Sequence, residues 1–271
     1  MQQLSISERW HSKRNQVFHW LRNIVQFRRK GYGENFDNSS PLDESFIAAG
    51  YLTQLKEIRE QLSPQIYRKN LSTLFTLEGI FADLDLGHEK LQDVLEVGAH
   101  DFSRLPALRI FFRARITGLE IDPFPILHDL HSRFDRAEYY QKVLKKICAL
   151  AHSYLAGDFF THQSSYDLVL CFYPFVSPHP SLAWGLSAEL GSAQKWRTSL
   201  ERCVKPGGLV LLVHQGEWEQ ETFDEVRDAE TLQLLARKVI QPPFESFPYP
   251  PHVSLYRRRR LCGGNSWKIE D

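Results

Sequence analysis

Short apolar runs separated by helix-length spacers are the feature of this sequence that most constrains its fold. Each run is bounded by turn-forming residues, and a weaker run at 153–157 has the same setting. Strands that alternate with helices predict βαβ crossovers, and therefore a doubly wound α/β fold with a mostly parallel sheet. The four strongest runs are 92–97, 115–121, 166–172 and 208–214.

The C-terminal part departs from this alternation. A helix is expected around 221–237, and two strand-like pieces then flank a proline-rich connector within 238–259. Such a pair of strands can add an antiparallel edge to an otherwise parallel sheet.

The N-terminal part reads as helical, with helices expected at 8–30, 42–62 and 65–84 and a loop at 31–41. We interpret residues 1–88 as a helical cap or accessory segment. Residues 89–271 then form the α/β domain.

The overall charge is balanced, with 33 basic and 33 acidic residues. The four cysteines show no zinc-knuckle or redox spacing, no apolar run of about 18 residues is present, and the N-terminus lacks the apolar core of a signal peptide. We therefore expect a reduced, cytoplasmic protein with no membrane partner, either a monomer or a homodimer. Two basic runs stand out, in residues 1–30 and at Arg257 to Arg260; a solvated surface is the first reading and contact with a polyanion the second.

Acidic residues follow two of the expected strands at the points where a nucleoside cofactor would bind. Glu120 comes 22 residues after Gly98, the spacing at which a carboxylate accepts hydrogen bonds from ribose hydroxyls. Asp158 ends the third strand and could accept a hydrogen bond from an adenine amino group.

The loop after the first strand, Glu96 to Phe102, restricts the choice of nucleoside. It has one glycine, and Glu96 and Asp101 would repel a pyrophosphate. S-adenosylmethionine has no phosphate and carries an ammonium and a sulfonium, so this loop disfavours a dinucleotide and permits S-adenosylmethionine.

The series DVLEVGAHDF, ITGLEIDP, AGDFF, YDLVLCFYPF and LERCVKPGGLVLLV resembles the successive motifs of class I, Rossmann-like S-adenosylmethionine-dependent methyltransferases. The resemblance covers residues 92–214 and extends to about 258. It implies a seven-stranded sheet whose last strand is antiparallel. It also implies a cofactor site made of Glu96, Gly98, His100, Glu120, Ile121, Asp158, Phe159, Cys171 and Phe172.

The first motif departs from the family pattern. The family has three glycines where this chain has Gly98, His100 and Phe102. The substitution leaves open the path of the loop and the affinity for the cofactor. His100 could hydrogen-bond the methionine carboxylate of the cofactor, or point to solvent.

Tyr173, His214 and Glu217 are the candidate catalytic residues, because they follow strands that end beside the expected site. His214 and Glu217 are preferred as base, although each could be a hydrogen-bonded wall residue. His128 and His131 lack a third ligand at a fixed offset, so we expect no metal.

These residues favour an S-adenosylmethionine-dependent methyltransferase acting on oxygen or nitrogen of a small-molecule acceptor. Two alternatives stay open. One is a methyltransferase of nucleic acid (RNA) that uses the basic runs, and the other is a methyltransferase-like protein that binds the cofactor but is catalytically silent.

Overall fold

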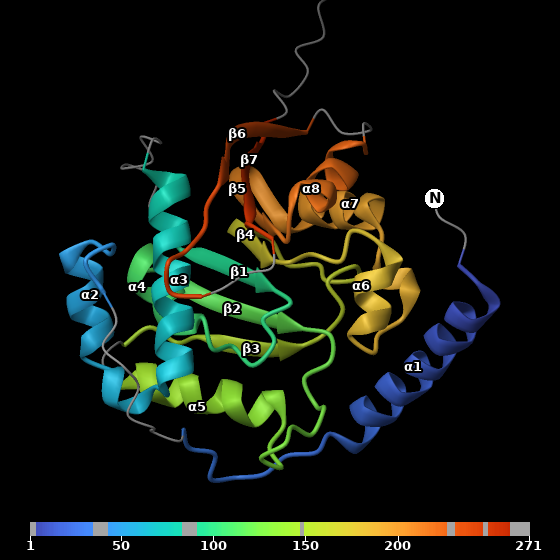
Figure 1. Cartoon of the computed structure of the whole chain (residues 1–271), viewed down its shortest axis with the longest axis horizontal. Helices are drawn as coiled ribbons and strands as arrows, with labels where there is room; N and C mark the ends of the chain where they lie inside the picture. The colour runs from blue at the N-terminus through green and yellow to red at the C-terminus, as the bar shows by residue number, and fades with distance from the viewer. Residues whose placement is uncertain are drawn as a thin grey trace, which may run out of the picture.

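The computed structural model of the chain describes residues 4–34, 43–82, 91–146, 149–226, 231–245 and 249–260. Its strands are β1 (Asp93–Val97), β2 (Arg115–Glu120), β3 (Ser153–Ala156), β4 (Tyr166–Phe172), β5 (Val204–His214), β6 (Leu232–Val239) and β7 (His252–Arg258). They form one sheet in the order β3-β2-β1-β4-β5-β7-β6, with helices on both faces (Figure 1). All neighbouring strands are parallel except the pairs that β7 makes with β5 and β6. The predicted fold class is confirmed.

The predicted C-terminal helix is wrong over its second half. An α-helix, α8, covers only Glu217–Asp224, and residues 232–239 form strand β6. The sequence of β6, LQLLARKV, is rich in good helix formers, yet it pairs along its length with β7. Pairing with a neighbouring strand outweighs the intrinsic helix propensity of this segment, which amounts to a few tenths of a kcal/mol per residue.

Three α-helices precede the sheet in the described residues. They are α1 (Ile6–Val25), α2 (Ala49–Lys56) and α3 (Pro64–Phe81), with a short 3-10 helix at Arg59–Gln61. Buried leucines and isoleucines of α2 and α3 share one hydrophobic core with residues of β1, β4, β5 and β7. The expected boundary at residue 88 lies outside the described residues, so the division into a cap and a domain stays an interpretation.

Besides α8, four described α-helices lie between consecutive strands. They are α4 (Leu105–Phe112), α5 (Arg133–Lys145), α6 (Pro178–Ala183) and α7 (Ala193–Cys203). The carboxyl ends of β1, β2 and β3 point toward α6, and α1 lies beside α6 at the same edge (Figure 1). Since ligands of open α/β sheets bind beyond the carboxyl ends of the strands, this edge is where a site is expected. None of the described helices is both long and apolar enough to cross a membrane.

Candidate functional site

A cavity of about 370 Å³ lies at the carboxyl edge of the sheet, over the ends of β1 to β4. It opens where the strand order reverses between β1 and β4, the usual ligand position in such folds. Eight of the nine residues expected to hold a cofactor line its wall: Gly98, His100, Glu120, Ile121, Asp158, Phe159, Cys171 and Phe172.

The loop after β1 keeps a glycine-like backbone although two of its glycines are replaced. Gly98, His100 and Phe102 all have positive φ, at 68°, 52° and 60°. A left-handed backbone costs a residue with a side chain about 1–2 kcal/mol, so the rest of the loop must hold these two residues in place. The substitutions therefore leave the left-handed turn of the loop in place.

Phe102 is buried and packs between neighbours of the loop. Its ring contacts Tyr154, with centroids 5.6 Å apart, and lies directly over Gly118 of β2. The hydroxyl of Tyr154 donates a hydrogen bond to the carbonyl of His100. The Phe102 side chain thus fills space under the loop, while the imidazole of His100 faces the cavity, edge-on to Trp184 at 5.9 Å.

Glu120, at the end of β2, is hydrogen-bonded to the loop that follows β1. Its Oε2 accepts a hydrogen bond from the backbone N–H of His100 at 2.8 Å. Its Oε1 accepts from the N–H of Asp122 at 3.0 Å, and the Arg133 guanidinium lies 3.5 Å away. A carboxylate has about four acceptor positions, so these three contacts leave capacity for one hydroxyl of a ligand, and for a second where it replaces the long Arg133 contact.

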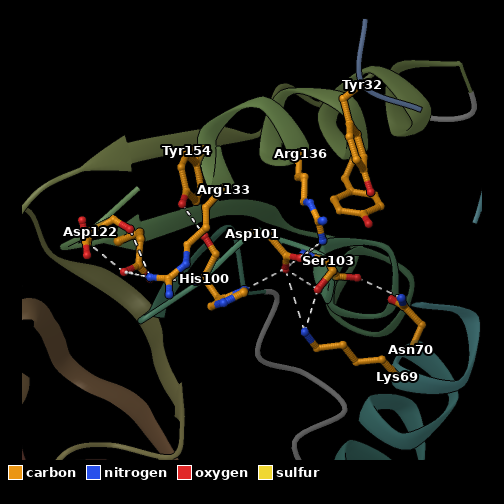
Figure 2. Close-up of polar contacts among 12 residues, drawn as sticks. Tyr32, Lys69, Asn70, His100, Asp101, Ser103, Asp122, Arg133, Arg136 and Tyr154 are labelled. Carbon is orange, nitrogen blue, oxygen red and sulfur yellow. Dashed lines mark hydrogen bonds and ion pairs between the residues drawn. The ribbon is translucent and has the colours of Figure 1, made fainter. Parts of the chain in front are cut away.

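Asp101 does not line the cavity, contrary to the argument that its charge would face a cationic cofactor. It is 3% exposed, and its carboxylate is surrounded by Ser103, Lys69, His100 and Arg136 (Figure 2). Burial by itself raises the pKa of Asp101, but Lys69 and the hydrogen bonds from His100 and Ser103 outweigh it and hold the pKa well below its usual value. The charged carboxylate of Asp101 therefore stabilises the loop through these contacts.

Glu96, the ninth expected residue, is buried in β1 and does not line the cavity. It is 1% exposed, and neither carboxylate oxygen has a hydrogen-bond partner. Burial raises its pKa to about 7, while Arg104 and Lys69 oppose that rise. Its side chain faces inward because β1 alternates, which places Leu95 and Val97 on the other face of the sheet.

Three basic residues that were not singled out in the sequence also line the cavity: Lys69, Arg104 and Arg133. Lys69 comes from α3 and donates to Ser103 Oγ at 2.7 Å, and burial lowers its pKa. The next residue, Asn70, holds the same loop by bonding to the carbonyl of Ser103 and the N–H of Ala107. In the sequence, the only sign of this role is that Lys69 and Asn70 are polar residues within the apolar face of a helix.

The third strand end contributes a turn and an aromatic wall. Asp158 Oδ1 accepts a hydrogen bond from the N–H of Phe160 at 2.8 Å. Phe159 packs against Trp196 of α7 with centroids 5.2 Å apart. This part of the cavity therefore combines a carboxylate with flat apolar surfaces.

At the end of β4 the backbone turns sharply at Tyr173, which has a φ of 64°. Cys171 is buried there, and burial raises the pKa of its thiol well above the usual value, so the group is a packed, uncharged thiol. The Arg104 guanidinium lies 4.3 Å from the centroid of the Phe172 ring. Tyr173, Phe175 and Trp184 complete an aromatic wall on this side.

The structure does not bring His214 and Glu217 to the cavity. His214 is fully buried, pairs with His252 of β7, and has a pKa lowered to about 3 because burial disfavours its charged form. Glu217 is exposed at the start of α8. Gln215 and Glu219 line the cavity instead, because the chain turns into α8 directly after β5.

Glu219, two residues after the predicted base Glu217, is the acid of α8 that lines the cavity. It is 6% exposed, accepts a hydrogen bond from the N–H of Gln215 at 2.9 Å, and its pKa is raised by burial. The described residues contain no group of three or more histidines, cysteines or acids placed to hold a metal ion.

The sheet has seven strands and its last strand, β7, is antiparallel, as the sequence motifs implied. The fold is Rossmann-like, with a doubly wound and mostly parallel sheet. Solved structures of similar fold include TrmN from Thermus thermophilus, with 13% identity, a TM-score of 0.44, 62% of this chain covered and 44% of TrmN. The chain thus spans less than half the length of TrmN.

Two further structures of similar fold differ in what they are named for. An S-adenosylmethionine-dependent methyltransferase from Aquifex aeolicus has 13% identity, a TM-score of 0.45 and coverage of 75% of this chain and 98% of its own. Geranyl diphosphate C-methyltransferase from Streptomyces coelicolor, in complex with S-adenosyl-L-homocysteine, has 9% identity, a TM-score of 0.44 and coverage of 71% and 80%. At these identities the likeness concerns the fold alone. No family model matches the chain. No curated protein matches it in sequence.

Proposed function

We propose that this chain is an S-adenosylmethionine-dependent methyltransferase that acts on a small-molecule acceptor. The observation that supports this best is the pairing of Glu120 with the loop after β1. The carboxylate stands at the end of β2 and at the same time fixes the N–H of His100, so the ribose position and the loop form one unit.

The cavity residues fit the parts of this cofactor. Glu120 would accept hydrogen bonds from the ribose hydroxyls, and Asp158 from the adenine amino group, with Ile121 and Phe159 against the ring. The open space at Gly98, where an added Cβ would meet nothing within 4 Å, suits the methionine part.

Positive charge in the cavity suits the carboxylate of the methionine part. Lys69, Arg104 and His100 line the cavity on the side of the β1 loop. S-adenosylmethionine, when bound, supplies an activated methyl group on its sulfonium. The chain itself has to position an acceptor in line with that group and exclude water.

The part of the cavity where the acceptor would bind has an aromatic wall and one acidic residue. Tyr173, Phe175 and Trp184 would hold a flat or apolar acceptor, and Glu219 would take a proton from an acceptor oxygen or nitrogen. Burial raises the pKa of Glu219, which makes its carboxylate a better base than an exposed one. This residue replaces His214 and Glu217 in the proposal.

The nucleic-acid alternative is weakened by the position of the second basic run. Arg257 pairs with Leu209 of β5, whose partner Leu168 lies near the start of β4, at the sheet edge opposite the cavity. Arg258 donates to the carbonyl of Val204 at that same end. The run is therefore remote from the site where an RNA base would have to bind.

Calorimetry tests this proposal. We expect S-adenosylmethionine and S-adenosylhomocysteine to bind the wild-type chain, and Glu120→Gln to weaken both by about 1–3 kcal/mol, the value of a hydrogen bond to a charged group. Glu217→Gln is the matched control, since this exposed acid lies outside the cavity wall, and its affinity should equal that of the wild type. No binding of either compound to the folded protein would refute the proposal.

Turnover separates the remaining alternatives. Methyl transfer to small aromatic or amine acceptors supports the proposed enzyme. Binding of the cofactor without transfer to any acceptor favours the silent protein. Salt-sensitive RNA binding that is lost when Arg28, Arg29 and Lys30 are neutralised favours the nucleic-acid enzyme.

A further inference from the structure

Helix α1 is amphipathic, but its polar side faces the protein. Ser12 Oγ accepts a hydrogen bond from the N–H of Ala188 at 3.0 Å, and Asn15 Nδ2 donates to the carbonyl of Leu186 at 3.1 Å. His19 Nε2 lies 2.7 Å from the carbonyl oxygen of Ile121. The inner side of α1 is thus held by hydrogen bonds where helices of globular proteins usually bury apolar side chains.

The same side of α1 is held by an ion pair between Arg22 and a buried carboxylate. Arg22 donates from Nε and Nη2 to the two carboxylate oxygens of Asp122, at 3.0 and 2.6 Å. The Asp122 side chain is 4% exposed. This two-pronged contact and the bonds of Ser12, Asn15 and His19 fix which side of the helix faces the solvent.

The opposite side of α1 is an exposed apolar stripe. At about 100° per residue, Ile6, Trp10, Val17, Leu21 and Ile24 fall on one line along the helix, opposite the hydrogen-bonded side. Their exposed fractions run from 41% for Leu21 to 88% for Ile6. Soluble monomers rarely leave such a contiguous apolar stripe open, so it marks a binding surface.

Basic residues flank this stripe. Arg9, Lys13 and Arg14 are exposed on α1, and Arg28 to Lys30 are exposed just after it. Glu8 is the single acid of the helix, and it is engaged by Ser5 and His179. A second copy of α1 would bring like charges together across the stripe, which disfavours a helix pair between two copies.

Trp10 lies within the stripe and Trp20 at its border with the basic residues, with 69% and 61% of their surface exposed. An apolar stripe of aliphatic residues, tryptophans at its border and lysine or arginine around it is the composition of helices that lie in a membrane interface. RNA could contact the arginines and tryptophans, but a line of isoleucine, valine and leucine does not favour RNA binding.

We propose that the outer face of α1 binds the surface of membranes that contain anionic lipids. The helix would lie in the plane of the interface, with its apolar stripe among the acyl chains and its basic residues at the headgroups. This changes the expectation from the sequence that the protein has no membrane partner. The inference does not depend on the proposed methyltransferase activity.

Sedimentation of the full-length chain with large unilamellar vesicles tests the proposal. One set of vesicles contains phosphatidylcholine and phosphatidylglycerol in equal amounts, and the other phosphatidylcholine alone. We expect partition onto the anionic vesicles to be at least about tenfold stronger, because each basic residue near an anionic surface adds attraction.

A triple variant, W10Q/V17Q/I24Q, removes the centre of the stripe while glutamine keeps the helix propensity. It should bind the anionic vesicles at least about tenfold more weakly, with an unchanged melting temperature, since the three side chains touch solvent. Trp218→Gln is the matched control: this tryptophan is 55% exposed but lies on α8, so its loss should leave vesicle binding unchanged.

Several results of these experiments would contradict the proposal. Absence of vesicle binding, equal binding to both vesicle sets, or wild-type binding by the triple variant would overturn the proposal. The proposal would also be overturned if the wild type did not bind vesicles but formed a dimer in sedimentation velocity, or a complex with RNA, that the triple variant no longer formed. Calorimetry with S-adenosylhomocysteine on the same samples keeps failure here distinct from failure of the proposed enzyme.

Discussion

The ring of Phe102 lies over the Cα of Gly118, so closely that a Cβ on Gly118 would stand 2.7 Å from the ring. Phe102 occupies the last glycine position of the first motif, and Gly118 lies in the neighbouring strand β2. The loop carries a large side chain at this position, and Gly118 in the neighbouring strand leaves room for it.

Gly118→Ala tests this contact. The added methyl would also meet the Cβ of Ala99 at 2.9 Å, so neither neighbour can yield without moving the loop. We expect a loss of about 1–3 kcal/mol in the free energy of unfolding, measured by urea denaturation.

A double-mutant cycle with Phe102→Leu supplies the control for this contact. The smaller side chain relieves the clash, so the two changes together should cost less than the sum of the single changes. Strict additivity would mean that the ring and the strand do not touch.

His100 tests whether the loop stores backbone strain. Replacement by glycine and by alanine both remove the imidazole, but only glycine accepts a φ of 52° without strain. The glycine variant should therefore be more stable than the alanine variant by about 1 kcal/mol in urea denaturation.

The matched position for this comparison is Thr198, exposed in the middle of α7. There the order should reverse, with alanine more stable than glycine, because a helix interior disfavours glycine. If alanine were more stable than glycine at both positions, the backbone at His100 would not be left-handed.

Glu96 makes the stability depend on pH. Burial raises its pKa from 4.5 to about 7 in the folded protein. Between these values the folded state holds a proton that the unfolded state has lost, so stability is greatest on the acid side and falls as pH rises from about 5 to 7. The fall attributable to Glu96 is about 2–3 kcal/mol.

Glu96→Gln removes this titration. The variant should gain stability relative to the wild type as pH rises through that window, measured by urea denaturation at several pH values. Because other titrating groups are common to both proteins, they cancel in the comparison. Parallel curves for the two proteins would contradict a raised pKa at Glu96.

Arg22→Ala should release α1 from the sheet edge. The change leaves the buried carboxylate of Asp122 without the Arg22 guanidinium, which costs more than an exposed ion pair would. We expect amide hydrogen exchange in α1 to accelerate by at least about tenfold while the strands keep their protection. Lys13→Ala, at an exposed position of the same helix, should leave the exchange of α1 unchanged.

The sequence predicted the central strands because they are buried and nearly continuous in apolar residues, as in β4. It failed at β6, an edge strand whose half-exposed residues look helical and whose shape depends on pairing with β7. The C-terminal strand pair suggested an antiparallel edge, and the number of strands came only from the family motifs.

At the site, the strand ends could be predicted and the helices could not. Glu120 and Asp158 follow recognisable strands, whereas Lys69 reaches the cavity from α3, far away in the chain. The error at His214 has a plain cause. The alternation along β5 places its side chain on a buried face of the sheet, 5.9 Å from the ring of Phe223 in α8, and the next residue, Gln215, lines the cavity.

The central claim is that the cavity at the carboxyl edge holds S-adenosylmethionine, and a crystal structure with S-adenosylhomocysteine bound tests it most directly. The account predicts the ribose hydroxyls within hydrogen-bond distance of the Glu120 carboxylate and the adenine amino group at Asp158. It also predicts a loop backbone unchanged at His100 and Phe102. A ligand bound elsewhere, or one in the cavity whose ribose makes no contact with Glu120, would contradict it.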